Sequence, residues 1–559
     1  MPETSMRQAS EALRVIPLGG LGAIGRNMTV FEYGDAMIVV DAGLMFPDES
    51  MPGIDLVLPD FTYVVGRGAK VLGVILTHGH EDHTGALPYL LRELPVPVYG
   101  TRLTLGLVNG KLGEHGLQGK VEFKEIAPGE ELELGPFRVE FLQVCHSIPD
   151  GVGLALTTPV GVVVHSGDFK LDQTPVDCRV TALHRFGELG QKGVLLLLSD
   201  STNAETPGYT QPERAVGRSL DSIFARARGR IIVASFASHI HRLQQVFEVA
   251  AAFGRSVAVV GRSMVRNVNI ASNLGYLTIP PGTLVRPQDI ADIPDDRLVI
   301  ISTGSQGEPM SALARMASHD HRLVRIQRGD TVVISVRPVP GNERSVSRTI
   351  NRLFAAGADV IYEPLAQVHV SGHAAAEELK MLLNLVRPRF FMPVHGEYRH
   401  LHFHAELARQ TGMSDDAIFI MDNGDVLELD GSGAAVVEKV QAGMIFVDGM
   451  AIGDQEVVLR DRHHLATDGI VIAVVTVRAQ DGAMAAEPEV AFKGFVHSGD
   501  LDDLADQARN IVEEALLSGE IQQITDTSII KAHVHDVLQR FLFKETRRRP
   551  MVMPVIVEV

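Results

Sequence analysis

Short apolar runs recur through the first two hundred residues, and polar or glycine-rich stretches separate them. Apolar runs that end at such stretches are typical of buried strands. We expect strands at 14–18, 28–32, 36–41, 71–76, 97–99, 121–123, 137–141, 153–157, 162–165 and 195–198. The pattern therefore predicts a first part of the chain that is rich in β-structure.

The pattern changes near residue 212, where longer helical segments alternate with apolar strands. Helices are expected near 214–227 and 239–253, and strands at 231–233, 257–260, 297–301 and 331–335. This alternation is typical of a doubly wound α/β domain. A further unit begins after about 450, with strands at 471–477 and 551–559 and helical patterns near 500–518 and 525–543.

The length of 559 residues indicates two to four domains, and a hydrophobic content of 45% supports large cores. The two cysteines, Cys145 and Cys178, exclude a disulfide framework. No uninterrupted apolar run reaches the ~18 residues that a membrane span requires. The first ten residues are polar, so we expect a soluble cytoplasmic protein without a membrane segment.

The formal net charge is −18, which at first argues against a nucleic-acid partner. The charges are unevenly distributed, however, since residues 211–365 hold 19 Arg, no Lys and 13 acidic residues. Arginine presents a planar fork that binds phosphate through two hydrogen bonds. We therefore expect part of this segment to contact phosphate.

The stretch from His78 to His83 is the densest group of metal-ligand residues in the chain, with three imidazoles and two carboxylates. It follows the predicted strand 71–76 and precedes a helical pattern, so we place it on a loop at a strand end. Imidazole and carboxylate suit Zn²⁺, Mn²⁺ or Fe. One ion would be held by His78 and His80, and a second by Asp82 and His83.

A two-ion site needs more ligands than this loop offers. Four further residues each follow an apolar strand, and they are Asp41, His146, Asp168 and His395. The glycine-rich stretch 20–25 matches GxGxxG, but a β-like run rather than a helix follows it. We interpret it as a hairpin loop and not as a dinucleotide site.

The order and spacing of Asp41, His78–His83, His146 and Asp168 resemble those of the metallo-β-lactamase superfamily. Residues 199–203 (SDSTN) resemble the acidic motif that opens the β-CASP insertion of nucleic-acid-processing members. Residues 364–373, which end in HVSGH, resemble its later histidine motif, and 393–397 (PVHGE) resemble the final one. Together with a C-terminal unit of roughly 100 residues, these motifs resemble the bacterial ribonuclease J family along essentially the whole chain.

The resemblance implies an αββα metallo-β-lactamase sandwich that an α/β β-CASP domain interrupts, followed by an α+β C-terminal domain. We expect the sandwich at 1–212 and 365–450, the β-CASP domain at 213–364 and the last domain at 451–559. RNA would enter between the first two domains.

The resemblance also implies two divalent ions per subunit, Zn²⁺ or Mn²⁺. His78, His80 and His146 would hold one ion, while Asp82, His83 and His395 would hold the other, with Asp168 between them. Asp41 would orient ligands from behind. Glu81 is not expected to bind metal, and Cys145 is expected to pack beneath the site.

The implied reaction is metal-assisted hydrolysis of RNA phosphodiester bonds, in RNA decay and maturation. It runs 5′→3′ from 5′-monophosphate ends, with additional endonuclease activity. Asp82 would accept a proton, and His373, oriented by Asp200, would protonate the leaving oxygen. Residues expected to bind the 5′-phosphate are His369, Val370, Ser371, Gly372 and His373, completed by Ser238, His239, Arg262 and Ser263.

The family forms dimers or tetramers, so a homodimer or homotetramer is expected, as are partners in an RNA-degradation complex. Three alternatives stay open on the residues alone. One is another β-CASP nuclease, acting on DNA or on RNA 3′ ends. The others are a small-molecule metallohydrolase, which would not need the Arg-rich insertion, and an inactive RNA-binding scaffold, which full retention of ligand-type residues opposes.

Overall fold

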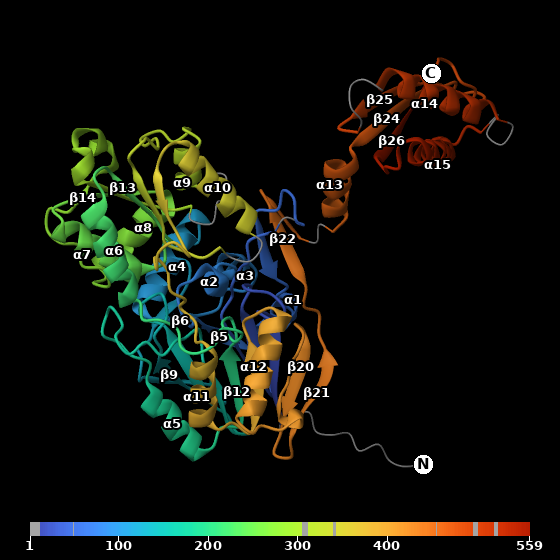
Figure 1. The fold of residues 1–559 in the computed structure, drawn as a ribbon. Coiled ribbons are helices and arrows are strands. Elements are labelled where there is room, and N and C mark those ends of the chain that lie inside the picture. The colour runs from blue at the N-terminus through green and yellow to red at the C-terminus, as the bar shows by residue number, and fades with distance from the viewer. Residues whose placement is uncertain are drawn as a thin grey trace, which may run out of the picture. The chain divides into compact units, whose positions relative to one another are not determined.

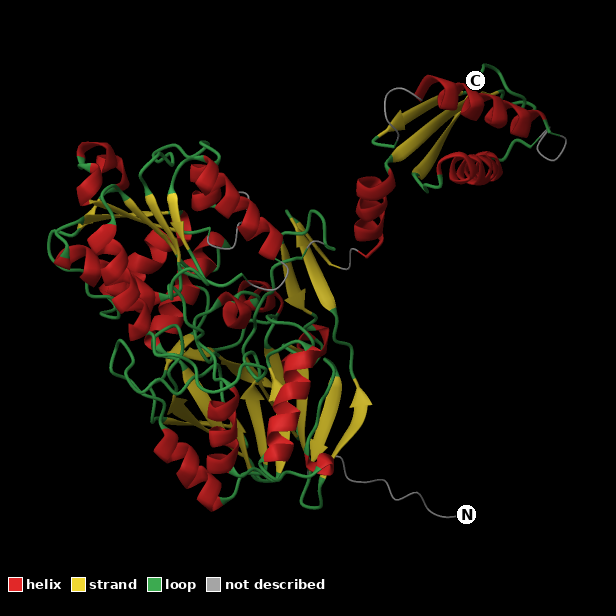
Figure 2. Ribbon diagram, in the orientation of Figure 1, coloured by secondary structure: helices red, strands yellow, loops and turns green. Residues whose placement is uncertain are grey.

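The computed structural model describes residues 12–48, 50–304, 311–338, 342–453, 456–495, 501–518 and 524–559. The chain forms two compact units. The larger unit consists of Met1–Phe46 and Asp55–Val447, and the second unit consists of Pro47–Ile54 and Asp448–Val559. Figures 1 and 2 show strands and helices interleaved throughout the larger unit. The second unit begins close to the expected boundary at 451, but the sequence did not suggest that residues 47–54 would group with it.

Two sheets form the first domain of the larger unit. One has the order β21 (Ala434–Lys439), β20 (Asp425–Leu429), β1 (Leu13–Gly19), β2 (Met28–Tyr33), β3 (Ala36–Val40), β5 (Val71–Ile75), β6 (Val98–Gly100) and β7 (Phe123–Glu125). The other has the order β19 (Phe390–Val394), β12 (Leu196–Asp200), β11 (Val162–His165), β10 (Val152–Thr157), β9 (Phe137–Gln143) and β8 (Glu131–Leu134). Val15 and Phe31 from one sheet share a core with Val139 and Leu154 from the other, so the sheets pack face to face.

Helices cover the outer faces of both sheets. On the first sheet these are α1 (Thr62–Val65), α3 (Leu87–Glu93) and α4 (Arg102–Glu114); on the second they are α5 (Leu183–Lys192), α11 (Ala376–Val386) and α12 (Tyr398–Gln410). The result is the expected four-layer αββα sandwich, because alternate residues of each strand bury one face inside and one beneath helices.

The chain leaves this sandwich after β12 and returns in β19. The two strands are parallel neighbours, with Leu196 opposite Phe390 and Asp200 opposite Val394. Residues almost two hundred positions apart in sequence therefore end their strands side by side. Beyond β19, β20 pairs with β1, and β22 (Met444–Asp448) pairs with β4 (Leu56–Pro59).

The inserted domain contains one parallel sheet. Its order is β15 (Leu284–Val285), β14 (Ser256–Val260), β16 (Leu298–Ser302), β13 (Ile231–Ala234), β17 (Thr331–Ile334) and β18 (Asp359–Ile361). On one face pack α6 (Arg214–Arg226), α7 (Ile240–Ala252) and α8 (Arg262–Asn273), and on the other α9 (Ala312–Ala317) and α10 (Glu343–Ala355). This confirms the doubly wound α/β pattern that the sequence predicted.

The second unit is α+β. Its sheet has the order β25 (Glu489–Lys493), β24 (Ile470–Val477), β26 (Met551–Glu558), and α14 (Leu501–Leu517) and α15 (Thr527–Thr546) pack on one face. The unit also contains β23 (Ala451–Gly453) and α13 (Glu456–Asp468). Among the described residues, no helix has the length and apolar character needed to cross a bilayer.

The glycine-rich stretch 20–25 connects β1 to β2, which pair antiparallel, so the hairpin interpretation is confirmed. The expectation of a loop for the whole of 78–83 is wrong in one respect. Residues Glu81–Thr84 form a helical turn, α2, in which the Thr84 amide donates to the His80 carbonyl. Asp82 and His83 are therefore consecutive residues of a hydrogen-bonded helical turn, which fixes their backbone.

Candidate active site

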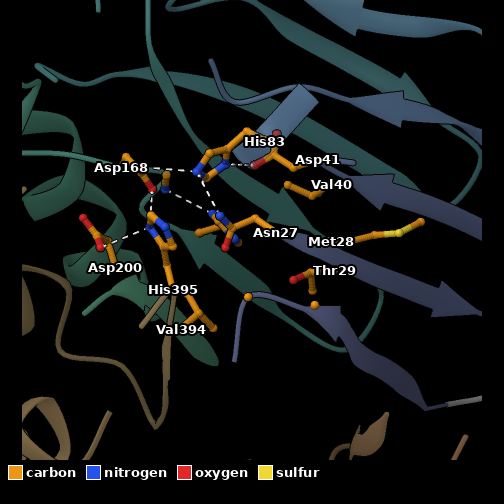
Figure 3. A pocket seen from close by; sticks show the side chains of 14 residues that line it. Asn27, Met28, Thr29, Val40, Asp41, His83, Asp168, Asp200, Val394 and His395 are labelled. Carbon is orange, nitrogen blue, oxygen red and sulfur yellow. Dashed lines mark hydrogen bonds and ion pairs between the residues drawn. The ribbon is translucent and has the colours of Figure 1, made fainter. Parts of the chain in front are cut away.

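Six strands of the sandwich end at one place, and each end carries a polar side chain. Asp41 follows β3, His78 and His80 follow β5, His146 follows β9, Asp168 follows β11, Asp200 ends β12 and His395 follows β19. Figure 3 shows Asp41, His83, Asp168, Asp200 and His395 directed toward one another around a pocket. The fold therefore gathers all the residues that the sequence singled out as ligands.

His78, His80 and His146 form the first group. The Nε2 atoms of His78 and His146 lie 3.0 and 3.2 Å from Nδ1 of His80. Nitrogens bound tetrahedrally to one Zn²⁺ at about 2.0–2.1 Å stand about 3.3 Å apart. The three rings thus already have the spacing that a shared ion requires.

Asp82, His83, Asp168 and His395 form the second group. Asp168 lies 3.2 Å from Nε2 of His83 and 2.9 Å from Nδ1 of His395. Its carboxylate also lies 3.6 Å from Nε2 of His78, a member of the first group. Asp168 therefore lies between the two groups, where a carboxylate can serve both.

Asp41 orients His83 through a hydrogen bond to the ring nitrogen that faces away from the site. Its carboxylate accepts from Nδ1 of His83 at 2.7 Å and from the amide and hydroxyl of Thr77, both at 2.8 Å. Nε2 of His83 is thereby directed toward Asp168. Thr77 was missed by the sequence reasoning, although its position directly before His78 was a signal that could have found it.

The backbone is strained at two of these residues. Asp41 has φ 63° and His395 has φ 55°, in the left-handed region that non-glycine residues rarely adopt. Each such conformation costs about 1–3 kcal/mol and persists where surrounding contacts hold it. Both residues turn sharply out of a strand end, which directs their side chains into the site.

Gly372 supports the first group from the returning segment. Its carbonyl accepts a hydrogen bond from Nδ1 of His146 at 2.7 Å, which leaves Nε2 of that ring for an ion. A Cβ at position 372 would lie 2.6 Å from Cε1 of His146. The sequence analysis placed Gly372 among the residues that bind the 5′-phosphate, and in the structure its close contact is with the ring of His146.

Burial and neighbouring charges give the two groups opposite protonation. Burial lowers the pKa of His78 and His146 well below the usual value and that of His80 to about 4, so these rings are neutral. Burial also opposes the charged forms of His83 and His395, but nearby carboxylates, Asp168 first, raise their pKa well above the usual value. The second group therefore attracts positive charge.

These observations fit divalent cations. Neutral imidazoles and ionised carboxylates are the forms that bind metal, so an ion in the second group would displace the protons of His83 and His395. Nε2 of His395 is buried and makes no hydrogen bond among the described residues, and the Asp82 carboxylate lies 3.4 Å from it, so one ion could bind both. Cys145 does not fit the donor set, because burial raises the pKa of its thiol to about 12.

Asp200 and His373 form a pair beside the second group. Nδ1 of His373 lies 2.7 Å from Asp200 and 3.9 Å from Asp168. Burial opposes protonation of His373, but the carboxylate of Asp200 outweighs it and raises the pKa of the ring. The His373 carbonyl accepts from Thr210 at 2.7 Å and from Asn203 at 3.2 Å, so the backbone is held as well as the ring.

The residues expected to bind phosphate are not equally placed. His369 and Ser371 lie half-buried in the returning segment, and Ser238, Arg262 and Ser263 lie where strands of the inserted sheet end. The side chains of Val370 and His239 are engaged within the protein. Val370 is buried in the hydrophobic core, so its side chain is not available to substrate. Both ring nitrogens of His239 face Arg242, within 3.3 and 3.4 Å, so this ring is used inside the protein.

Arg242 was not identified by the sequence analysis. It is fully buried on α7, and its Nε and Nη2 donate to the two carboxylate oxygens of Glu213 at 2.6 and 3.0 Å. Its Nη1 donates to the carbonyls of Ser335 and Val368 at 3.0 and 2.8 Å. Arg242 thus fixes the start of the returning segment 368–373 against the inserted domain.

Family comparisons divide the chain into four matches. Residues 21–202 match the metallo-beta-lactamase superfamily and 228–353 the ribonuclease J beta-CASP domain. Residues 357–420 match the RNA specificity domain of Zn-dependent metallo-hydrolases and 457–559 the ribonuclease J C-terminal domain.

Curated relatives match over nearly their full length. Ribonuclease J of Thermus thermophilus is 44% identical, with 100% of this chain and 97% of that protein covered. Ribonuclease J2 of Bacillus subtilis is 41% identical over 99% of this chain and 100% of that protein. Ribonuclease J 1 of Streptococcus pyogenes is 42% identical, with 97% of each covered.

Among solved structures, a protein of unknown function from Enterococcus faecalis V583 has a similar fold. It aligns with a TM-score of 0.52 at 15% identity, covering 75% of this chain and all of that one. The domain matches and the full-length identities show that this chain belongs to the ribonuclease J family and is a metal-dependent ribonuclease.

Proposed function

We propose that this ribonuclease degrades RNA 5′→3′ from 5′-monophosphate ends, cleaves internally as well, and acts in RNA decay and maturation. Since its substrate is RNA, we place it in the cytoplasm. The domains are assigned as 1–212 with 365–450, 213–364 and 451–559. The observation that carries the end preference is His369, whose buried Nδ1 has no hydrogen-bond partner in the described part of the chain.

Three cationic side chains act on the ring of His369. Burial first, then Arg242, Arg337 and Lys170, lower the pKa of its ring well below the usual value. These three cations are paired with Glu213, Glu363 and Asp172. A terminal phosphate would add a negative charge next to the ring and favour a proton on Nδ1 that the ring can donate. Ser371, two residues along, adds a hydroxyl, and its Oγ accepts from the His373 amide at 3.2 Å.

We assign two divalent ions, Zn²⁺ or Mn²⁺, to the two groups. His78, His80 and His146 would hold one and Asp82, His83 and His395 the other, with Asp168 shared. When bound, such ions supply a water of lowered pKa and screen the charge of the scissile phosphate. Asp82 is half-buried, and His83 and His395 hold its pKa low despite burial, so its carboxylate is ionised and would accept a proton from the attacking water. His373 donates a proton to the leaving 3′ oxygen, and Asp200 orients it.

The end preference is tested with RNAs that differ only in their 5′ group. We expect 5′-monophosphate RNA to decay at least about tenfold faster than 5′-triphosphate RNA. The variants His369→Gln and Ser371→Ala should reduce this ratio toward one and leave internal cleavage intact. Labelled RNA and matched DNA are followed from each end, with Mn²⁺ or Zn²⁺ added back after chelation.

Ser222→Ala, which changes an exposed serine of the inserted domain, is the control and should keep the wild-type ratio. Equal rates for both 5′ ends in the wild-type protein would refute the pocket. Cleavage of DNA as fast as RNA would instead indicate a broader β-CASP nuclease.

We further propose that the protein associates with a second copy through the second unit. The face of its sheet opposite α14 and α15 presents Ile472, Val474, Met553 and Val555, and Met553 is 52% exposed. Glu489 stands opposite Val474 and Lys493 opposite Ile470, at the two ends of this face. A two-fold axis across the strands would pair Lys493 of one copy with Glu489 of the other.

Light scattering after size exclusion tests this association. We expect at least a dimer for the wild-type chain and a monomer for Met553→Glu, because a charge would be buried unpaired. Met450→Glu changes a fully exposed methionine outside the face and should leave the dimer intact. A monomeric wild-type protein, or a dimer that survives Met553→Glu, would contradict the proposal.

A further inference from the structure

We infer that the inserted domain carries a second RNA-binding surface on its outer side, away from the active site. It consists of Arg344, Arg348 and Arg352 on α10 with Arg328 beside them, and we call it the arginine track. It deepens the ribonuclease activity proposed above by assigning a site for the body of the RNA rather than for its 5′ end.

The three arginines of α10 form one stripe. They stand four residues apart, so their side chains lie on one face, and successive Cα atoms are about 6 Å apart. All three are exposed, while Val346, Thr349 and Leu353 bury the opposite face in the core. A spacing of this size is comparable to that of neighbouring phosphates along an extended strand.

Arg348 and Arg352 have no acidic neighbour on their side of α10. On the helical wheel Ala355 lies between Arg344 and Arg348, and Asn351 and Ser347 lie beside Arg344. Glu343, the acidic residue of α10, lies about 100° from Arg344. Arg348 and Arg352 contact hydroxyls, at 3.4 Å to Ser345 and 3.1 Å to Ser318. Such contacts leave the guanidinium charge available for phosphate.

Neighbouring segments extend the positive charge. Arg352 reaches Ser318 at the end of α9, and Arg328 packs against Gly357, just beyond the end of α10. Residues 315–328 contain four arginines and one aspartate, Asp320. The charge that the sequence located in 211–365 is therefore gathered, in part, on one side of the inserted sheet.

The position of the track relates it to the active site. In a parallel sheet all strands end at the same edge, and Ser335, which follows β17, accepts from Arg242 and donates to the Val368 carbonyl at 2.7 Å. α10 begins after this edge and returns along the outer face, opposite α6, α7 and α8 (Figure 1). Arg344 is thus nearest the edge of the phosphate pocket, and Arg352 is farther out.

The occupant of the track is the phosphate backbone of single-stranded RNA. Arginine binds phosphate without reading sequence, and each contact releases counterions, so binding depends steeply on salt. Long RNAs would gain affinity from the track, and RNAs too short to leave the pocket would not. An acidic protein surface is the other occupant that such charge would suit.

The double variant Arg348→Gln/Arg352→Gln tests the track. For a 5′-monophosphate RNA of about 30 nucleotides we expect KM to rise roughly tenfold at 0.1 M salt, with kcat unchanged, since two phosphate contacts are lost. The slope of log KM against log salt should become shallower by about 1.4. A tetranucleotide should be cleaved as by the wild-type protein.

Arg226→Gln/Arg297→Gln removes the same charge from exposed positions elsewhere in the domain. It should leave cleavage of both the long RNA and the tetranucleotide unchanged. The track is refuted if the double variant leaves KM for the long RNA unchanged, which is the result expected if the track binds an acidic protein. It is also refuted if cleavage of the tetranucleotide is impaired to the same extent. If the wild-type protein shows no preference for a 5′-monophosphate on the tetranucleotide, the phosphate pocket is refuted instead. The dependence of KM on RNA length can still be measured in that case.

Discussion

Asp168→Asn is expected to abolish RNA hydrolysis, lowering it by about 10⁴-fold or more, because this carboxylate serves both proposed ions. It lies 2.9 Å from His395 and 3.2 Å from His83, and 3.6 and 3.8 Å from His78 and His146. Asparagine has nearly the same shape but no charge. The variant therefore removes the charge that offsets two adjacent cations.

Metal content distinguishes this effect from misfolding. After dialysis against limiting Zn²⁺ or Mn²⁺, we expect two ions per chain in the wild-type protein and fewer than one in Asp168→Asn, by mass spectrometry of the metal. Circular dichroism should show a folded chain. Asp35→Asn is the control, since its side chain is 97% exposed on the same domain.

Retention of two ions by Asp168→Asn, with activity within tenfold of the wild type, would show that Asp168 does not link the groups. Binding of a single ion to the wild-type protein would refute the two-ion assignment and leave the ribonuclease activity untouched.

His373→Ala is expected to slow cleavage by about 10²- to 10⁴-fold while metal content stays unchanged, as for loss of a general acid. The neighbouring carboxylate of Asp200 raises the pKa of this ring, so the protonated form persists to higher pH than for a free histidine. Donation requires that form, so kcat/KM should fall as pH rises through the pKa of His373.

Asp200→Asn tests the pairing. Loss of the carboxylate at 2.7 Å removes the charge that favours protonation, so the alkaline limb of the pH profile should move to lower pH. Asp200 also lies 3.4 Å from His395, so metal content is measured alongside. Single-turnover rates measured across the pH range give the position of the alkaline limb directly.

A substrate with sulfur in place of the leaving 3′ oxygen separates catalysis from structure, since a thiolate leaves without a proton. We expect this linkage to restore His373→Ala to near the wild-type rate. His402→Ala, an exposed histidine of α12, should behave as the wild type on both substrates. Failure of the sulfur substrate to rescue His373→Ala would assign the ring a structural part only.

Much of the secondary structure was predictable, because strand and helix periodicities differ and the apolar runs here are short and well separated. The helix predicted near 239–253 is α7, at Ile240–Ala252, and the strand predicted at 162–165 is β11. The helical turn at Glu81–Thr84 was not predicted. It contains the ligand-type residues themselves, whose polar pattern carries no hydrophobic period.

The sequence by itself determined which residues have the chemistry of a metal site, since their types and their recurrence after apolar strands can be read along the chain. Only the tertiary structure decided how they meet. β12 and β19 are neighbours, so Asp200 and His395 end side by side, and the returning segment places the Gly372 carbonyl on His146 and Arg242 under Val368. Contacts of this kind join residues more than a hundred positions apart through a backbone carbonyl or a buried guanidinium, and neither leaves a pattern in the local sequence.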